Sequence, residues 1–187
     1  MRTLFNWLLK WIKKVIFKVD PRPMLQILQE NGLILGNNCN IMDGCIIDPG
    51  HCWLIEIGNN VTLAPRVHIL AHDASTKREL GYTIIGKVKI GDNVFIGAGS
   101  VILPNVKIGN NVVIGAHSVI SKDIPSNSVA VGNPARIIKS YQDYMIEKKA
   151  LLESSKKYDY SYTINNITLT QKEQMKEELE NKIGFVV

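Results

Sequence analysis

Residues 90–120 read IGDNVFIGAGSVILPNVKIGNNVVIGAHSVI, and an isoleucine recurs at every sixth position of this stretch. The isoleucines are Ile90, Ile96, Ile102, Ile108, Ile114 and Ile120. A small or β-branched residue stands four places after each of them: Val94, Ser100, Val106, Val112, Ser118 and Ile124. A fixed short period of this kind indicates a fold built from repeats.

A period of six matches neither the 3.6 residues of a helical turn nor the simple alternation of a strand. It matches a prism with three flat faces, in which each hexapeptide supplies one short strand and one corner. Three hexapeptides then complete one coil, and successive coils stack at the spacing of neighbouring strands, about 4.8 Å. We therefore predict a mainly β solenoid.

The pattern extends upstream with two interruptions. Three hexapeptides between residues 35 and 52 form one predicted coil. Residues 53–56 then interrupt the repeats as a short insertion, and residues 72–87 form a longer excursion loop. Excursions from a rigid solenoid are where function is often found.

The 187 residues suit one domain with appendages. We expect a basic amphipathic helix and a linker helix over 1–32, the hexapeptide-repeat domain over 33–138, and a helical extension over 139–187. The linker helix is predicted at Met24–Glu30, where Asn31-Gly32 would end it. A last helix up to Lys182 would open with a capping box at Thr170.

Charge is concentrated at the N-terminus. Residues 1–19 carry five basic residues and no acidic one, whereas the remaining 17 basic residues balance the 17 acidic residues. A balanced body argues against nucleic acid as a partner. Three cysteines argue against a disulfide framework. No apolar run reaches the roughly 20 residues of a membrane span, and lysines interrupt any secretory signal, so a cytoplasmic protein is expected.

The helix predicted over residues 3–19 has two interpretations. Its apolar stripe could pack against the solenoid while its lysines remain solvated. Alternatively, the helix could lie in a membrane interface, where tryptophan and basic residues are enriched. The second interpretation would give peripheral contact with the inner face of a membrane.

His72 is the candidate general base, because it opens the excursion loop, where an imidazole can be partly exposed. A loop histidine without a role is the alternative. His117 is expected at a corner, and His51 and His68 inside repeats. A catalytic zinc site needs three protein ligands, and no third histidine stands in register with His68 and His72, so no metal is predicted.

Two Gly-Ala pairs, Gly97-Ala98 and Gly115-Ala116, lie one coil apart and are predicted to stack on one corner. Small residues there would leave a groove with free backbone amides, along which a thin chain could lie. Lys122 and Arg136 could receive phosphates near the same end. Alternatively, the corner simply requires small residues and the two cations are solvated.

The chain resembles the hexapeptide-repeat acyltransferases, which fold as a left-handed parallel β-helix. The branch it resembles contains galactoside, maltose, nodulation-factor and surface-polysaccharide O-acetyltransferases. The matching segments are Ile57–Val61, Ala64–Val67, the loop at His72, Ile90–Gly97, Ile114–Ala116, Ser121–Pro125 and Gly132–Arg136. They cover most of residues 55–138.

The resemblance implies a bacterial homotrimer with acetyl-CoA as co-substrate, no metal, and active sites between adjacent prisms. It implies that His72 is the catalytic histidine. It also implies a coenzyme A groove lined by Gly97, Ala98, Gly115, Ala116, Ser121, Lys122 and Arg136. The acceptor would meet Arg66, Asp73 and Tyr82. Two of these depart from the common pattern, which has proline at position 73 and often asparagine at 66.

The expected function is acetyl transfer to a hydroxyl of a sugar or surface-glycan precursor, without an acyl-enzyme. An N-acetyltransferase that acts on an amino sugar or a xenobiotic is the first alternative. The second is a non-catalytic hexapeptide scaffold or a metal-dependent hydratase.

Overall fold

The computed structural model describes residues 23–187, so the helix predicted over residues 3–19 lies outside the described residues. The chain forms two compact units, which divide after Ile137. The first unit contains the repeats, and the second begins at Ile138. None of the helices within residues 23–187 is long and apolar enough to cross a membrane.

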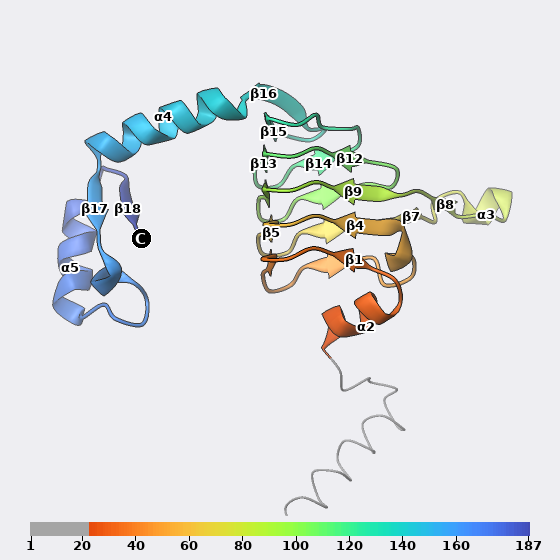
Figure 1. Ribbon diagram of the computed structural model, residues 1–187, viewed down its shortest axis with the longest axis horizontal. Coiled ribbons are helices and arrows are strands. Elements are labelled where there is room, and N and C mark those ends of the chain that lie inside the picture. The colour runs from red at the N-terminus through yellow and green to blue at the C-terminus, as the bar shows by residue number, and fades with distance from the viewer. Residues whose placement is uncertain (1–22) are drawn as a thin grey trace, which may run out of the picture. The chain divides into compact units, whose positions relative to one another are not determined.

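The first unit is a stack of coils whose three walls are sheets A, B and C (Figure 1). Sheet A contains β1 Ile34–Leu35, β4 Ile55–Ile57, β9 Val88–Ile90 and β12 Lys107–Ile108. Sheet B contains β2 Asn40–Ile41, β5 Thr62–Leu63, β10 Val94–Ile96, β13 Val112–Ile114, β15 Ser128–Val131 and β16 Arg136–Ser140. Sheet C contains β3 Ile46–Ile47, β6 His68–Ile69, β11 Val101–Ile102 and β14 Val119–Ile120. Strands of successive coils pair in parallel, which confirms the predicted mainly β solenoid.

The register shows where extra residues enter the stack. Equivalent corner residues lie 18 positions apart in a regular coil, as Asp92 and Asn110 do. They lie 22 apart between the first and second coils and 33 apart between the second and third. The chain therefore carries one insertion of four residues and one of fifteen.

The short insertion was predicted at residues 53–56, but the structure places it elsewhere. Ile55–Ile57 is the regular strand β4, and both isoleucines are 1% exposed. Burial of these side chains keeps the strand in the wall, so the four extra residues enlarge the corner between β3 and β4. The 3₁₀ helix η1, Cys52–Leu54, forms within that corner.

The prism interior is filled by the isoleucines of the repeat. Ile90, Ile96, Ile102, Ile108, Ile114 and Ile120 are each at most 1% exposed. The corner between sheets A and B is closed by an asparagine ladder. Asn60, Asn93 and Asn111 have φ between 54° and 56°, a left-handed conformation that asparagine tolerates better than most residues. Each of their side-chain amides donates to the asparagine of the next coil, at 3.0–3.1 Å.

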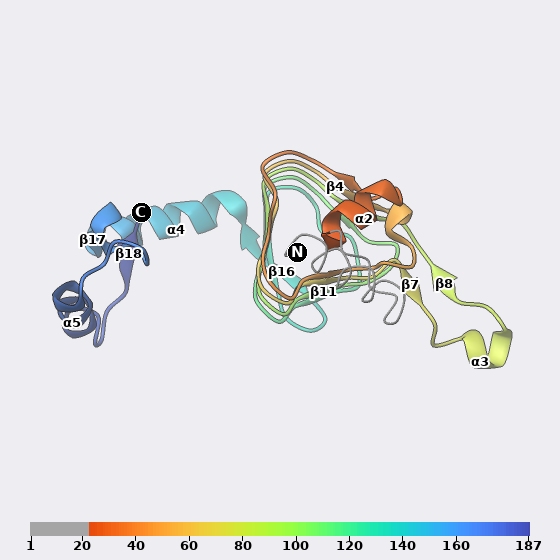
Figure 2. The ribbon, with the colours of Figure 1, turned by 90° about the horizontal axis from the view of Figure 1, so that it is seen from below.

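The long insertion forms an arm that stands out from the prism (Figures 1 and 2). Strands β7, His72–Asp73, and β8, Ile84–Ile85, pair antiparallel at its base. The helix α3, Lys77–Leu80, lies near its tip. Leu80 and Tyr82 are 66% and 80% exposed.

The helix α2, Met24–Glu30, confirms the predicted linker helix, and its Leu28 is buried in the core. The second unit contains α4 Tyr141–Ser154, β17 Lys156–Tyr158, η2 Tyr160–Tyr162, α5 Leu169–Glu178 and β18 Gly184–Val186. This unit contains the helices α4 and α5 and also the strands β17 and β18, which pair in parallel. The capping box is formed by Thr168 and Gln171, not by Thr170, since the Thr168 hydroxyl accepts from the Gln171 amide.

Candidate active site

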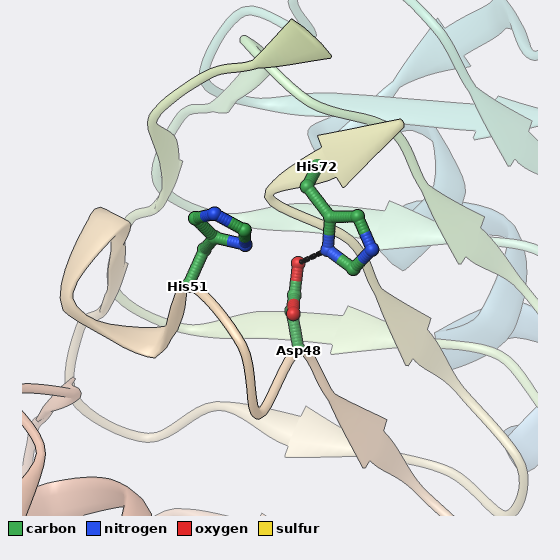
Figure 3. Close-up of side chains that lie close together, drawn as sticks. All are labelled: Asp48, His51 and His72. Atoms are coloured by element: carbon green, nitrogen blue, oxygen red, sulfur yellow. Dashed lines mark hydrogen bonds and ion pairs between the residues drawn. The ribbon is translucent and has the colours of Figure 1, made fainter. Parts of the chain in front are cut away.

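The candidate site is a hydrogen-bonded pair, Asp48 and His72, at the base of the arm (Figure 3). The His72 Nδ1 lies 2.5 Å from the Asp48 Oδ2. The Asp48 side chain is fully buried, whereas the His72 side chain is 37% exposed. A buried carboxylate therefore holds one edge of an imidazole whose other edge can meet solvent or a substrate.

Both residues come from the same corner of the prism in adjacent coils. Asp48 follows β3, and His72 stands three places after the end of β6, the strand paired with β3 in sheet C. The two insertions leave the stack at this corner, one above the other. Stacking of the coils thus brings together residues 24 positions apart in the sequence.

Asp48 is held in place by the backbone around it. Its Oδ1 accepts from the Gly50 amide and its Oδ2 from the Ala71 amide, both at 3.0 Å. Burial alone would raise the pKa of Asp48, but the hydrogen bonds from His72, Ala71 and Gly50 outweigh it and lower the pKa. Asp48 is therefore an anion at neutral pH, suited to orient and stabilise a protonated imidazole.

A second histidine lies against the pair. The ring centroids of His51 and His72 lie 5.0 Å apart, and the ring centroids of His51 and Trp53 lie 5.3 Å apart. The His51 Nδ1 is buried and has no hydrogen-bond partner among the described residues. His51 was predicted inside a regular repeat, but it lies in the enlarged corner, directly before η1.

The residues predicted for the donor groove divide between two corners on either side of sheet C. Gly97 packs on the coil of Gly115 and Ala116, so the predicted stacking of the two Gly-Ala pairs is present at the corner between sheets B and C. Ser121 and Lys122 directly follow β14, at the corner between sheets C and A. Ala98 and Ala116 directly follow Gly97 and Gly115 in the sequence. Arg136 is the first residue of β16 in sheet B.

The residues predicted for the acceptor do not form one cluster within the chain. Asp73 is exposed on β7, and its Oδ1 accepts from the Ser75 amide at 2.8 Å. Tyr82 lies on the arm, and its carbonyl accepts from the Thr76 hydroxyl at 2.9 Å. Arg66 occupies a left-handed corner position, with φ of 63°, and its side chain packs over Gly44.

Comparison with known proteins agrees with this architecture. The family described as "Bacterial transferase hexapeptide (six repeats)" matches residues 87–122. Protein CapG of Staphylococcus aureus is 36% identical over 156 residues, which cover 80% of this chain and 91% of CapG. The chain belongs to the hexapeptide-repeat acyltransferases.

This acyltransferase also resembles enzymes of known reaction. It is 43% identical over 94 residues to a galactoside O-acetyltransferase of Escherichia coli strain K12. That match covers 49% of this chain and 46% of the relative, so the chain spans about half the length of the galactoside enzyme. A Vibrio cholerae hexapeptide-repeat acetyltransferase, solved with acetyl-coenzyme A, is 30% identical with a TM-score of 0.53, over 59% of this chain and 61% of that chain.

Two residues of the candidate site, Asp48 and His51, were not predicted from the sequence. Asp48 and His51 were assigned to a regular hexapeptide, because the four-residue insertion was placed after them. A partial signal was present, because Asp48-Pro49-Gly50 is a turn sequence that does not fit a regular strand. The burial of Asp48 is evident only in the stacked coils.

Proposed function

We propose that this acyltransferase transfers an acetyl group from acetyl-CoA to a hydroxyl of a sugar or surface-glycan precursor, with His72 as general base. The observation that carries the proposal is the half-exposed His72 imidazole held by the buried Asp48 carboxylate. The likeness to a galactoside O-acetyltransferase supports a sugar acceptor. The Vibrio cholerae enzyme, solved with acetyl-CoA, supports the donor.

In the proposed mechanism the His72 Nδ1–H donates a hydrogen bond to Asp48, and this tautomer keeps the lone pair on Nε2. Nε2 takes the proton of the acceptor hydroxyl, and the oxygen attacks the thioester carbonyl carbon. A backbone amide of the groove stabilises the oxyanion of the tetrahedral intermediate. The C–S bond then breaks, and the coenzyme A sulfur takes the proton from the His72 imidazolium. Asp48 stabilises that imidazolium while it exists.

Direct transfer needs no acyl-enzyme. Cys52 is buried, and its Sγ lies 3.5 Å from the Leu28 carbonyl oxygen. Cys39 and Cys45 are half-buried, with their Sγ atoms close to carbonyl oxygens of the next coil. A cysteine nucleophile must be accessible to the acyl donor, and none of the three cysteines is an exposed residue.

The functional unit in this proposal is a homotrimer of left-handed parallel β-helices, with each site between two adjacent prisms. The arm supports it, because Leu80, Tyr82, Ile84 and Ile85 are large apolar or aromatic side chains that are exposed in the single chain and that a second copy could cover. A neighbouring prism would also supply the donor-groove corner that lies across sheet C from His72. The protein would work in the cytoplasm, at the inner membrane face when residues 1–19 bind lipid.

The proposal is tested by turnover of acetyl-CoA with a panel of sugar, glycan-precursor and amine acceptors. We expect hydroxyl acceptors to react and His72→Ala to lower kcat by roughly 10²- to 10⁴-fold. Acetyl-CoA at about 100 times its Kd should stabilise both proteins by roughly 2.7 kcal/mol, seen as a raised melting temperature.

The control variant is His117→Ala, because His117 is an exposed corner residue outside the Asp48–His72 pair. It should keep the activity of the wild type. An unchanged rate in His72→Ala would refute the assignment of the base. Reaction of amine acceptors alone would make the enzyme an N-acetyltransferase.

A further inference from the structure

We propose that Asp48, His51 and His72 form a binding site for a zinc-like divalent metal ion that reversibly inhibits the enzyme. Each of the three side chains offers one ligand atom, and these atoms all lie within 4.8 Å of one another. Figure 3 shows the three side chains converging from the enlarged corner and the base of the arm. Two imidazoles, one carboxylate and an open fourth position are a ligand set that zinc accepts.

The buried Nδ1 of His51 is the observation that points to a ligand. It has no partner among the described residues, although a buried polar atom without a hydrogen bond costs free energy. Zn–N and Zn–O bonds are about 2.0–2.2 Å long, which places two ligands of a tetrahedral ion about 3.3 Å apart. To reach that spacing, the Asp48 Oδ2 and His72 Nδ1 atoms would move apart from 2.5 Å, and the His51 ligand atom starts within 4.8 Å of the other two ligand atoms.

The surroundings of the cluster suit a metal ion. The Gly50 and Ala71 amides fix the orientation of the Asp48 carboxylate, as hydrogen bonds around metal ligands commonly do. The Trp53 ring borders His51 on an apolar side. The 37% exposure of His72 leaves a path for the ion and room for water as the fourth ligand.

Inhibition follows from the chemistry of one imidazole. The two ring nitrogens of a neutral imidazole share a single N–H proton, which lies on Nδ1 while that N–H donates a hydrogen bond to Asp48. When the ion binds Nδ1, that proton leaves to water and Nε2 takes one up, so the number of protons on His72 is unchanged. Nε2 then has no lone pair for the acceptor hydroxyl. The inhibitory step rests on the proposed function, whereas metal binding does not.

Binding is measured first, on the full-length enzyme after chelator treatment and dialysis against zinc. We expect one zinc ion per chain in the wild type and in His117→Asn, the exposed-histidine control. His51→Asn should weaken the affinity at least tenfold, and His51→Gln provides a second variant if the first does not fold. Added cobalt should give the visible absorption of a four-coordinate ion only where His51 is present.

Acetyl transfer is measured next, with and without zinc. The wild type should lose activity with saturating zinc and regain it with a chelator. At the same zinc concentration, each His51 variant should keep most of the turnover that it shows without zinc. Unchanged zinc affinity in the His51 variants would overturn the site, even if the enzyme proved inactive with every acceptor. Zinc bound through His51 without loss of turnover would overturn the inhibition alone.

Discussion

Asp48 orients the His72 imidazole through the hydrogen bond to its Nδ1. Its carboxylate has three hydrogen-bond donors around it, of which two are backbone amides fixed by the fold. Because those amides do not move with the state of His72, the carboxylate is oriented before an acceptor binds. Such preorganisation would let the buried anion stabilise a cationic imidazolium if His72 acts as the proposed base.

We predict that Asp48→Asn lowers kcat by roughly 10²-fold or more while the KM for acetyl-CoA changes little. The amide keeps the size of the side chain but removes the negative charge, and it can hold the imidazole in the wrong tautomer. Steady-state kinetics with the best acceptor measures the effect. Asp43→Asn, which changes an exposed corner carboxylate, is the control. Equal kcat values for the wild type and Asp48→Asn would contradict a role for the pair.

His72 could be predicted from the sequence because it opens the only long break in the repeat. Asp48 and His51 could not be placed in the same way. A stretch of four extra residues can be assigned to several positions when the flanking residues are all apolar, as Ile46, Ile47, Leu54 and Ile55 are. Burial of Ile55 and Ile57 in the wall settles the register, and burial is a property of the stacked coils.

At the scale of the elements, the asparagine ladder joins one coil to the next. Each rung combines a left-handed backbone position with a side-chain hydrogen bond to the following coil. The six-residue period predicts these corners, because the glycine and asparagine residues recur with it. The alternation of buried and exposed residues in β9, β10 and β13 follows the same period.

We predict that Asn111→Ala destabilises the protein by about 1–2 kcal/mol, because alanine disfavours the left-handed conformation. Asn111→Gly should cost less, since glycine adopts φ of 54° freely and only the ladder hydrogen bonds are lost. Melting temperatures of the two variants measure the difference. Because both variants lose the same ladder hydrogen bonds, a lower melting temperature for glycine than for alanine would contradict the backbone-strain argument.

The second unit has its own dependence on pH. Desolvation and the hydrogen bond to Glu178 raise the pKa of Tyr158 to about 12, and hydrogen bonds from Gln174, Tyr158 and Lys156 lower the pKa of Glu178. The raised tyrosine pKa contributes stability that is present below about pH 10 and is lost as the pH rises towards 12. The lowered carboxyl pKa contributes stability that is present above about pH 4.5 and is lost as the pH falls further.

We therefore predict that residues 138–187 are most stable between these limits. The near-ultraviolet circular dichroism of the Tyr158–Tyr162 ring pair, whose centroids lie 4.8 Å apart, reports on this unit. On heating, this signal should be lost at a lower temperature when the pH is outside that range than when it is inside it. Tyr158→Phe should remove the alkaline loss and retain most of the acid loss. Identical alkaline profiles for the variant and the wild type would exclude Tyr158 as the titrating group.

At the scale of the whole molecule, the body is neutral and residues 1–19 carry the excess charge. We predict that the full-length protein sediments with vesicles containing anionic lipid, because each basic residue near such a surface adds about 1 kcal/mol. Removal of residues 1–19 should abolish sedimentation while acetyl transfer to a water-soluble acceptor persists. Equal sedimentation of both proteins would assign the contact to another surface.

The stacking of Asp48 on His72 also has a consequence for folding order. Contacts in the prism join each coil mainly to its neighbours, so structure can grow from one end by short loop closures. The two residues come from the first and second coils, 24 positions apart. His72 and Asp48 can therefore meet while the later coils are still being synthesised, so the proposed catalytic pair is among the first parts of the prism to mature.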